Sequence, residues 1–159
     1  MGIAAIELCR HVIRPTLLYL DRQSTCAESL LLGIAASQSA LGAELDSPRG
    51  HGLYSIPELL HRHLWDSYLA LDPDLASRVR GLASQHAFLS SPHLELTVNL
   101  RYSTAIAWLM IEAQTPSLPT EDDPLAMARI WRMVFQPQGR LEDFITVWNS
   151  SVAPLYLPA

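Results

Sequence analysis

The chain of 159 residues contains no lysine, and all eleven of its cationic side chains are arginines. Aspartate and glutamate together number sixteen, which gives a formal net charge of −5. Nucleic-acid binding relies on basic side chains that neutralise backbone phosphates, and this sequence has no basic stripe. The composition therefore argues against a nucleic-acid partner.

Cysteine is scarce, with only Cys9 and Cys26, and these two form no C-x-x-C motif. Two isolated cysteines make neither a metal-ligand set nor a disulfide framework, so we expect buried free thiols. His61 and His63 lie two residues apart, on roughly opposite faces of a helix, and no H-E-x-x-H motif is present. The sequence therefore predicts no metal site and no cofactor.

Long apolar runs are also missing, because no stretch reaches the roughly 20 apolar residues of a membrane-spanning helix. The apolar N-terminal segment MGIAAIELCRHVIRP is interrupted by Glu7 and Arg10 and has no positively charged start. We therefore expect a first helix there rather than a signal peptide, and no membrane span.

Apolar residues, in contrast, make up 49% of the chain, against 17% charged residues. A chain of this size and composition is typical of one globular domain, which we expect to span residues 1–159. Strand patterns are almost absent. Three residue pairs place a capping side chain before a proline that suits the first helical position. These pairs are Asp72-Pro73, Ser91-Pro92 and Asp123-Pro124.

The sequence therefore predicts an all-α domain with at most a short hairpin or irregular loop near residues 42–54. The segment 92–114 is apolar on most sides, so we expect it to form a central helix wrapped by its neighbours. The expected helices span about residues 3–13, 15–21, 25–41, 56–70, 73–86, 92–114, 124–135 and 141–150.

Three stretches occur in an order that carries a family resemblance. AASQSALG (35–42) closes an expected helix, GLYSI (52–56) follows a polar loop, and NLRYSTAIAWL (99–109) lies in the expected central helix. In this order they resemble the A-x-x-E-S-x-x-G, G-L-x-Q-I and N-x-x-x-(G/A)-x-x-(Y/W)-L segments of lysozyme-like transglycosylases and goose-type lysozymes. The flanking segments also resemble small bacteriophage-encoded proteins of that group. The resemblance implies a lysozyme-like fold and a peptidoglycan partner.

Two departures from the family pattern bear on catalysis. Gln38 stands at the position of the family's catalytic glutamate, and Ser55 replaces the glutamine of the second segment. Cleaving a glycosidic bond needs an acid that protonates the leaving oxygen, and a carboxamide has no such proton to give. Losing a general acid typically costs about 10²–10⁴-fold in rate. Glutamine nevertheless keeps the size and the hydrogen-bonding capacity to hold a sugar.

Other carboxylates are candidates for the missing acid. Glu44 and Asp46 follow the Gln38 helix, in the loop that borders the substrate cleft in the family, so both are candidate surrogate acids. The alternative is that they are solvated loop carboxylates. Thr25 and Glu28 fit a capping box at the far end of the same helix, which makes Glu28 a cap rather than an acid.

Two hypotheses from different classes follow. In the first, the chain is a catalytically degenerate lysozyme-like phage or prophage protein, a virion or tail module that binds other virion proteins or a peptidoglycan glycan strand. In the second, it is an active muramidase or lytic transglycosylase that uses Glu44 or Asp46 as its acid. Both imply a location in the virion or the bacterial host cytoplasm, and the oligomeric state stays open. The residues that the resemblance implies at the substrate are Gln38, Ser39, Tyr54, Ser55, Asn99 and Tyr102.

Overall fold

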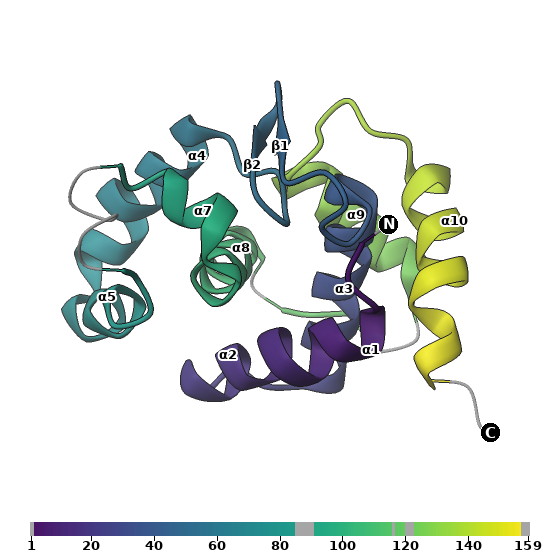
Figure 1. Cartoon of the computed structure of the whole chain (residues 1–159), viewed down its shortest axis with the longest axis horizontal. Helices are drawn as coiled ribbons and strands as arrows, with labels where there is room; N and C mark the ends of the chain where they lie inside the picture. Colours follow the sequence, from purple (N-terminus) through teal and green to yellow (C-terminus); the bar gives the residue numbers. More distant parts are fainter. Residues whose placement is uncertain (1, 85–90, 116, 120–122, 157–159) are drawn as a thin grey trace.

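The structure is a computed structural model that describes residues 2–84, 91–115, 117–119 and 123–156. Within these ranges the chain is mainly helical and carries one short antiparallel hairpin, formed by β1 (Asp46–Ser47) and β2 (Gly50–His51) (Figure 1). The predicted all-α class is confirmed, and the segment 42–54, for which at most a short hairpin or irregular loop was expected, contains the hairpin. The elements surround α8, which lies near the middle of the molecule in Figure 1.

The N-terminal helical segment is continuous where the sequence predicted a break before Pro15. It consists of α1 (Ala5–Leu8), a π-helical turn (Cys9–Ile13) and α2 (Arg14–Tyr19). Proline has no N–H to offer to the carbonyl four residues before it, which here belongs to His11. Arg101 of α8 donates to that carbonyl instead, at 3.2 Å. The wide turn and this donor from another helix accommodate the proline without a break.

Helix α3 (Thr25–Ser39) begins one residue earlier than the predicted capping box requires. Ser24 is the N-cap, and its hydroxyl accepts the backbone N–H of Ala27 at 3.0 Å. Glu28 is not a cap but a buried carboxylate, 2% exposed, which accepts from Arg14 at 2.9 and 3.0 Å. Glu28 therefore ties α3 to α2, and the predicted capping box is wrong.

The end of α3 turns sharply toward the hairpin. Ala40, Leu41 and Gly42 have φ values of 51°, 57° and 89°, in the left-handed region that side chains with a Cβ rarely adopt. The hydroxyl of Ser39 accepts the Gly42 N–H at 3.0 Å and donates to the Leu53 carbonyl at 2.6 Å. These bonds hold the turn and fix the segment after the hairpin against the helix end.

The base of the hairpin packs without room for side chains at two positions. A Cβ on Gly50 would lie 2.2 Å from the carbonyl oxygen of Ser55, and one on Gly52 would lie 1.7 Å from that of Leu96. Gly52 also has a φ of 80°. The sequence G-x-G therefore lets the backbone of the hairpin lie directly against the 52–56 turn and against α7.

The expected helix at 92–114 is two helices, α7 (Leu94–Val98) and α8 (Leu100–Gln114), so the prediction of one helix is wrong. Asn99 interrupts it with φ −116° and ψ 95°, and its side-chain oxygen accepts the backbone N–H of Tyr102 at 3.0 Å. An asparagine cap supplies the acceptor that the new helix start needs. Pro92 does not open the helix either, because α7 begins after His93.

The other two aspartate–proline pairs cap helices as predicted. Asp72 accepts the Leu75 N–H at 3.1 Å, and Asp123 accepts the Ala126 N–H at 3.0 Å. The remaining elements are α4 (Glu58–His63), a π-helical turn (Leu64–Tyr68), a 3₁₀ turn (Leu69–Leu71), α5 (Pro73–Arg80), α9 (Pro124–Val134), α10 (Leu141–Ser151) and a 3₁₀ turn (Ala153–Tyr156). The predicted helix 73–86 is thus shorter in the structure, and its predicted last residues, 85 and 86, lie outside the described part.

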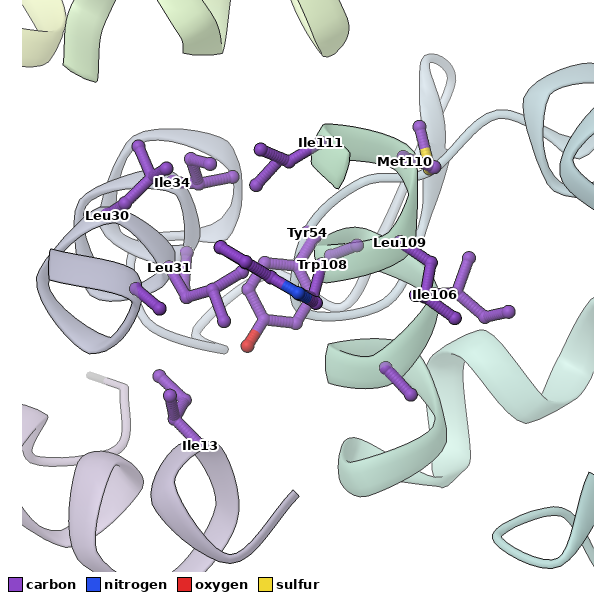
Figure 2. Close-up of a cluster of buried hydrophobic side chains, with 14 of the residues drawn as sticks. Ile13, Leu30, Leu31, Ile34, Tyr54, Ile106, Trp108, Leu109, Met110 and Ile111 are labelled. Carbon is purple, nitrogen blue, oxygen red and sulfur yellow. The ribbon is translucent and has the colours of Figure 1, made fainter. Parts of the chain in front are cut away.

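The core lies between α3, α8 and the segment that follows the hairpin. Figure 2 shows Leu31, Tyr54 and Trp108 in this space, and each is at most 4% exposed. Cys9 and Cys26 are buried thiols, as expected. Helix α10 crosses α3 at Gly33, where a Cβ would lie 2.6 Å from the Phe144 ring. This close crossing places α10 and the turn before it beside the end of α3, where Gln38 lies.

Candidate functional site

Gln38, the penultimate residue of α3, is held at both ends of its side-chain amide. The oxygen Oε1 accepts the indole N–H of Trp131 at 3.1 Å, and the nitrogen Nε2 donates to the Tyr54 carbonyl at 3.2 Å. An indole N–H only donates and a carbonyl only accepts, so these partners fix which way the amide points. The half-buried side chain is therefore a positioned group rather than a mobile surface glutamine.

The three stretches that carry the family resemblance meet at this point. Ser55 donates its hydroxyl to the backbone carbonyl of Gln38 at 3.1 Å, which joins the second stretch to the first. The hydroxyls of Tyr54 and Thr104 are 2.8 Å apart, which joins the second stretch to the third. Segments that are distant in sequence thus form one hydrogen-bonded unit around the end of α3.

An open hollow of about 370 Å³ lies beside Gln38. It is formed by the end of α3, the tip of the hairpin, α9, the 136–140 turn and α10. Its lining residues are Ser37, Gln38, Arg49, Trp131, Gln136, Gln138, Gly139, Arg140, Asp143 and Val147. We call this the Gln38 hollow.

The lining of the Gln38 hollow is rich in groups that both donate and accept hydrogen bonds. Three carboxamides, one hydroxyl and one indole ring border it, and the buried Oγ of Ser37 has no hydrogen-bond partner. Arg49 and Arg140 stand against the single carboxylate of Asp143, so the lining is positive although the whole chain carries −5. Such a surface suits a ligand that has many hydroxyl groups and some negative charge.

Several residues expected at the substrate lie in the interior instead. Tyr54 and Tyr102 are 0% exposed, and burial raises the pKa of both phenols well above its usual value. Neither ring lines the Gln38 hollow. Ser39 is also buried and Asn99 caps α8, so both hold backbone groups, whereas the two phenol hydroxyls bond to other side chains in the interior. Tyr54 contributes to the site through its carbonyl, not through its ring.

The two predicted surrogate acids do not line the Gln38 hollow. Glu44 is exposed in the turn after α3, and Asp46 pairs with His51 at 3.4 Å in the lining of a different hollow. The carboxylate that does line the Gln38 hollow is Asp143 of α10. Sequence analysis missed Asp143 because no motif surrounds it, and only the crossing of α10 over α3 brings it near residue 38.

Among the described residues, no group of three or more histidines, cysteines, aspartates or glutamates is arranged to hold a metal ion. None of the helices in the same ranges is long and apolar enough to cross a membrane.

The fold and the site thus define a mainly helical protein with a positioned amide at a polar hollow. No protein-family model, curated protein or solved structure matches this chain. Its function is therefore inferred from the Gln38 hollow and from the resemblance of the three stretches.

Proposed function

We propose that the protein is a catalytically degenerate lysozyme-like module that binds a glycan strand in the Gln38 hollow without cleaving it. The observation that carries this proposal is the double hydrogen bond of the Gln38 amide, at the lip of an open polar hollow. An amide at this position can hold a sugar hydroxyl or amide, but it cannot protonate a leaving oxygen.

The surroundings of Gln38 fit a neutral carboxylic acid as well as they fit an amide. Both groups can accept from the Trp131 indole with one atom and donate to the Tyr54 carbonyl with the other. An ionised carboxylate could not, because its second oxygen would face the carbonyl oxygen at about the same 3.2 Å. Such surroundings raise the pKa of a carboxyl group, which is the property a general acid in glycoside cleavage needs. This supports descent from an acid site.

The charge of the lining favours a glycan that bears carboxylates. Arg49 and Arg140 offer planar guanidinium groups, which bind carboxylates with paired hydrogen bonds. Gln136 and Gln138 add neutral donors and acceptors for hydroxyl and amide groups. A peptidoglycan strand, with amide-bearing sugars and acidic substituents, combines these features.

The alternative, an active muramidase or lytic transglycosylase, is favoured by one observation. Asp143 lines the Gln38 hollow, whereas Glu44 and Asp46 do not. If the protein cleaves glycans, Asp143 is therefore the better candidate for the acid among the described carboxylates near Gln38.

Co-sedimentation with purified cell-wall sacculi tests the proposal, with release of soluble muropeptides measured in the same tubes. We expect retention without release, and retention at least about fivefold weaker for Arg49→Gln or Gln136→Ala, because each removes hydrogen bonds to the ligand. Gln114→Ala is the matched control, since Gln114 is exposed on α8 and lines another hollow.

Two outcomes would decide against this function. Absence of retention for the wild type would overturn glycan binding. Muropeptide release that is abolished by Asp143→Asn, and not by Glu44→Gln, would instead establish the enzyme.

The proposal extends to a virion or tail location, with other virion proteins as partners. Mass spectrometry of purified particles tests that extension independently of the glycan assay. Absence of the chain from particles would leave a host-side binding protein.

A further inference from the structure

The hairpin that contributes Arg49 to the Gln38 hollow also borders a second open hollow, of about 410 Å³. His51 lies at the base of the hairpin, with Nδ1 3.4 Å from Asp46 and Nε2 3.3 Å from Glu58 of α4. His93, just before α7, lies in the same lining and its ring is nearly parallel to that of His51, with the centroids 6.3 Å apart. The hairpin, α4 and the start of α7 therefore meet around the His51 ring.

His93 continues into a buried chain of hydrogen bonds. Its Nδ1 is 2.9 Å from Nδ1 of His61, and Nε2 of His61 is 2.7 Å from the hydroxyl of Tyr102. The Tyr102 hydroxyl also accepts the indole N–H of Trp65 at 2.9 Å. His61 is 1% exposed, so its ring is held between α7 and α8 with no access to bulk water.

The contact between His61 and His93 has room for a single proton. One Nδ1 must donate and the other must accept, because two protonated nitrogens at 2.9 Å would set N–H against N–H. His61 cannot use its other nitrogen to escape, since Tyr102 already occupies it. Protonating both rings therefore breaks the link between α4 and the start of α7.

The surroundings shift this protonation to lower pH but do not prevent it. Burial lowers the pKa of His61 to about 4, with His93 and His51 adding to the effect. Burial also lowers the pKa of His93, against a favourable contribution from Glu58. The charged and titratable groups around the pair are Asp46 of β1, His51 of β2, Glu58 and Arg62 of α4, Glu95 of α7 and Tyr102 of α8.

A continuous set of contacts joins the histidines to Gln38. The backbones of His51 and Ile56 exchange hydrogen bonds of 2.9 and 3.1 Å, and the carbonyl of Ser55 lies directly against Gly50. Ser55 and Tyr54 in turn hold the backbone and the side chain of Gln38. The hairpin has only two residues in each strand, so its position depends on these contacts.

We propose that proton uptake by the His61–His93 pair is an acid switch that shifts the hairpin and weakens ligand binding in the Gln38 hollow. At neutral pH the shared proton joins α4 to the start of α7, and His51 packs beside them. Near pH 4 the pair separates, the hairpin loses its support, and Arg49 and the 52–56 turn leave their places in the hollow. The ligand part of this inference rests on the proposed function, whereas the conformational part does not.

A ¹⁵N NMR titration of the Trp131 indole from pH 7.5 to 4 tests the conformational part without any ligand. The indole N–H donates to Gln38, so its resonance reports the hollow directly. We expect it to shift with the ring resonances of His61 and His93 in the wild type and to stay fixed in His93→Gln. In that variant the amide can accept from a protonated His61, so no conflict arises.

His63→Gln is the matched control, because His63 is an exposed histidine on α4 outside the cluster. This variant should show the wild-type titration, and circular dichroism should confirm that both variants are folded at pH 7.5. A Trp131 resonance that stays fixed while His93 titrates would overturn the coupling, as would an unchanged shift in His93→Gln.

Retention on sacculi at the two pH values tests the ligand part. We expect about tenfold weaker retention at pH 4 than at pH 7.5 for the wild type, and the same retention at both pH values for His93→Gln. Absence of retention at pH 7.5 overturns the proposed function, and the NMR titration still decides the switch. Retention that is equal at both pH values overturns the switch and leaves glycan binding in place.

Discussion

At residue 38 a single heavy atom distinguishes an amide from a carboxylic acid, and the surroundings accept either group only in its neutral form. The Trp131 indole needs an acceptor, and the Tyr54 carbonyl needs a donor. Gln38 meets both needs at every pH, which a carboxyl group can do only while protonated. Whether a carboxyl group fits this position therefore depends on one proton.

The variant Gln38→Glu should be close to the wild type in stability at pH 4 and less stable by about 1–3 kcal/mol at pH 7.5. Its folded-state pKa should lie above the roughly 4.3 of the unfolded chain. Stability is then fully present below the unfolded pKa and is lost as the pH rises through the folded pKa. Urea unfolding at several pH values measures this, with Gln138→Glu, at an exposed position of the same hollow, as the control. A difference in stability from the wild type that does not depend on pH would contradict a raised pKa at position 38.

The Gln38→Glu variant also tests whether the hollow descends from an active site. If the hollow descends from an active site, Gln38→Glu should gain weak release of muropeptides from sacculi, since general acid catalysis contributes about 10²–10⁴-fold. Gln138→Glu should gain none.

At the scale of single elements, the end of α3 is a strained part of the fold. Ala40 has a φ of 51°, and it is exposed, so no side-chain contact offsets the cost of the left-handed conformation. Glycine adopts this conformation without a Cβ clash. The sequence thus places an alanine where helix ends commonly have glycine.

Replacing that residue by glycine should therefore stabilise the protein. We expect Ala40→Gly to raise the free energy of unfolding by about 0.5–1 kcal/mol, as measured by urea unfolding. Ala43→Gly, three residues on at an exposed position without positive φ, is the matched control and should be neutral or destabilising. A loss of stability in Ala40→Gly would mean that the helix does not end in this geometry in solution.

Element boundaries also show how far local patterns predict structure. The aspartates before Pro73 and Pro124 cap their helices because a short acceptor, a fixed φ and a missing N–H act within one turn. Pro15 and Asn99 were misjudged, since their effects depend on partners elsewhere. Arg101 donates to the carbonyl for which Pro15 has no N–H. The Asn99 side chain also donates to the Leu82 carbonyl at 2.7 Å, which stabilises the break between α7 and α8.

At the scale of the whole molecule, buried titratable groups make the fold sensitive to acid. Burial lowers the pKa of His61 to about 4. Burial opposes ionisation of Glu28 as well, but hydrogen bonds from Arg14, Gln23 and Cys9 hold its pKa below the usual range. The histidine favours the folded state above the unfolded pKa of roughly 6.5, and the carboxylate does so above roughly 4.3.

The free energy of unfolding should therefore fall by about 2 kcal/mol between pH 7.5 and pH 4.5, since His61 takes up its proton in the unfolded chain first. Below pH 4.5 the loss should continue as Glu28 is protonated. Urea unfolding across this range measures both steps, and His63→Gln should follow the wild type. A stability that is flat from pH 7.5 to pH 4.5 would mean that His61 is not buried as a neutral ring.

The sequence by itself determined the helical class, the position of a short hairpin or irregular loop, the buried thiols and the absence of an acid at residue 38, because each depends on residue type or on neighbours within a few positions. It also identified the stretches that meet around Gln38. Only the tertiary structure decided what surrounds that amide. The crossing of α10 over α3 at Gly33 brings Asp143 to the hollow, and the meeting of α4, α7 and α8 brings His61 to His93 and Tyr102. Such contacts join residues far apart in the chain, so no local spacing encodes them.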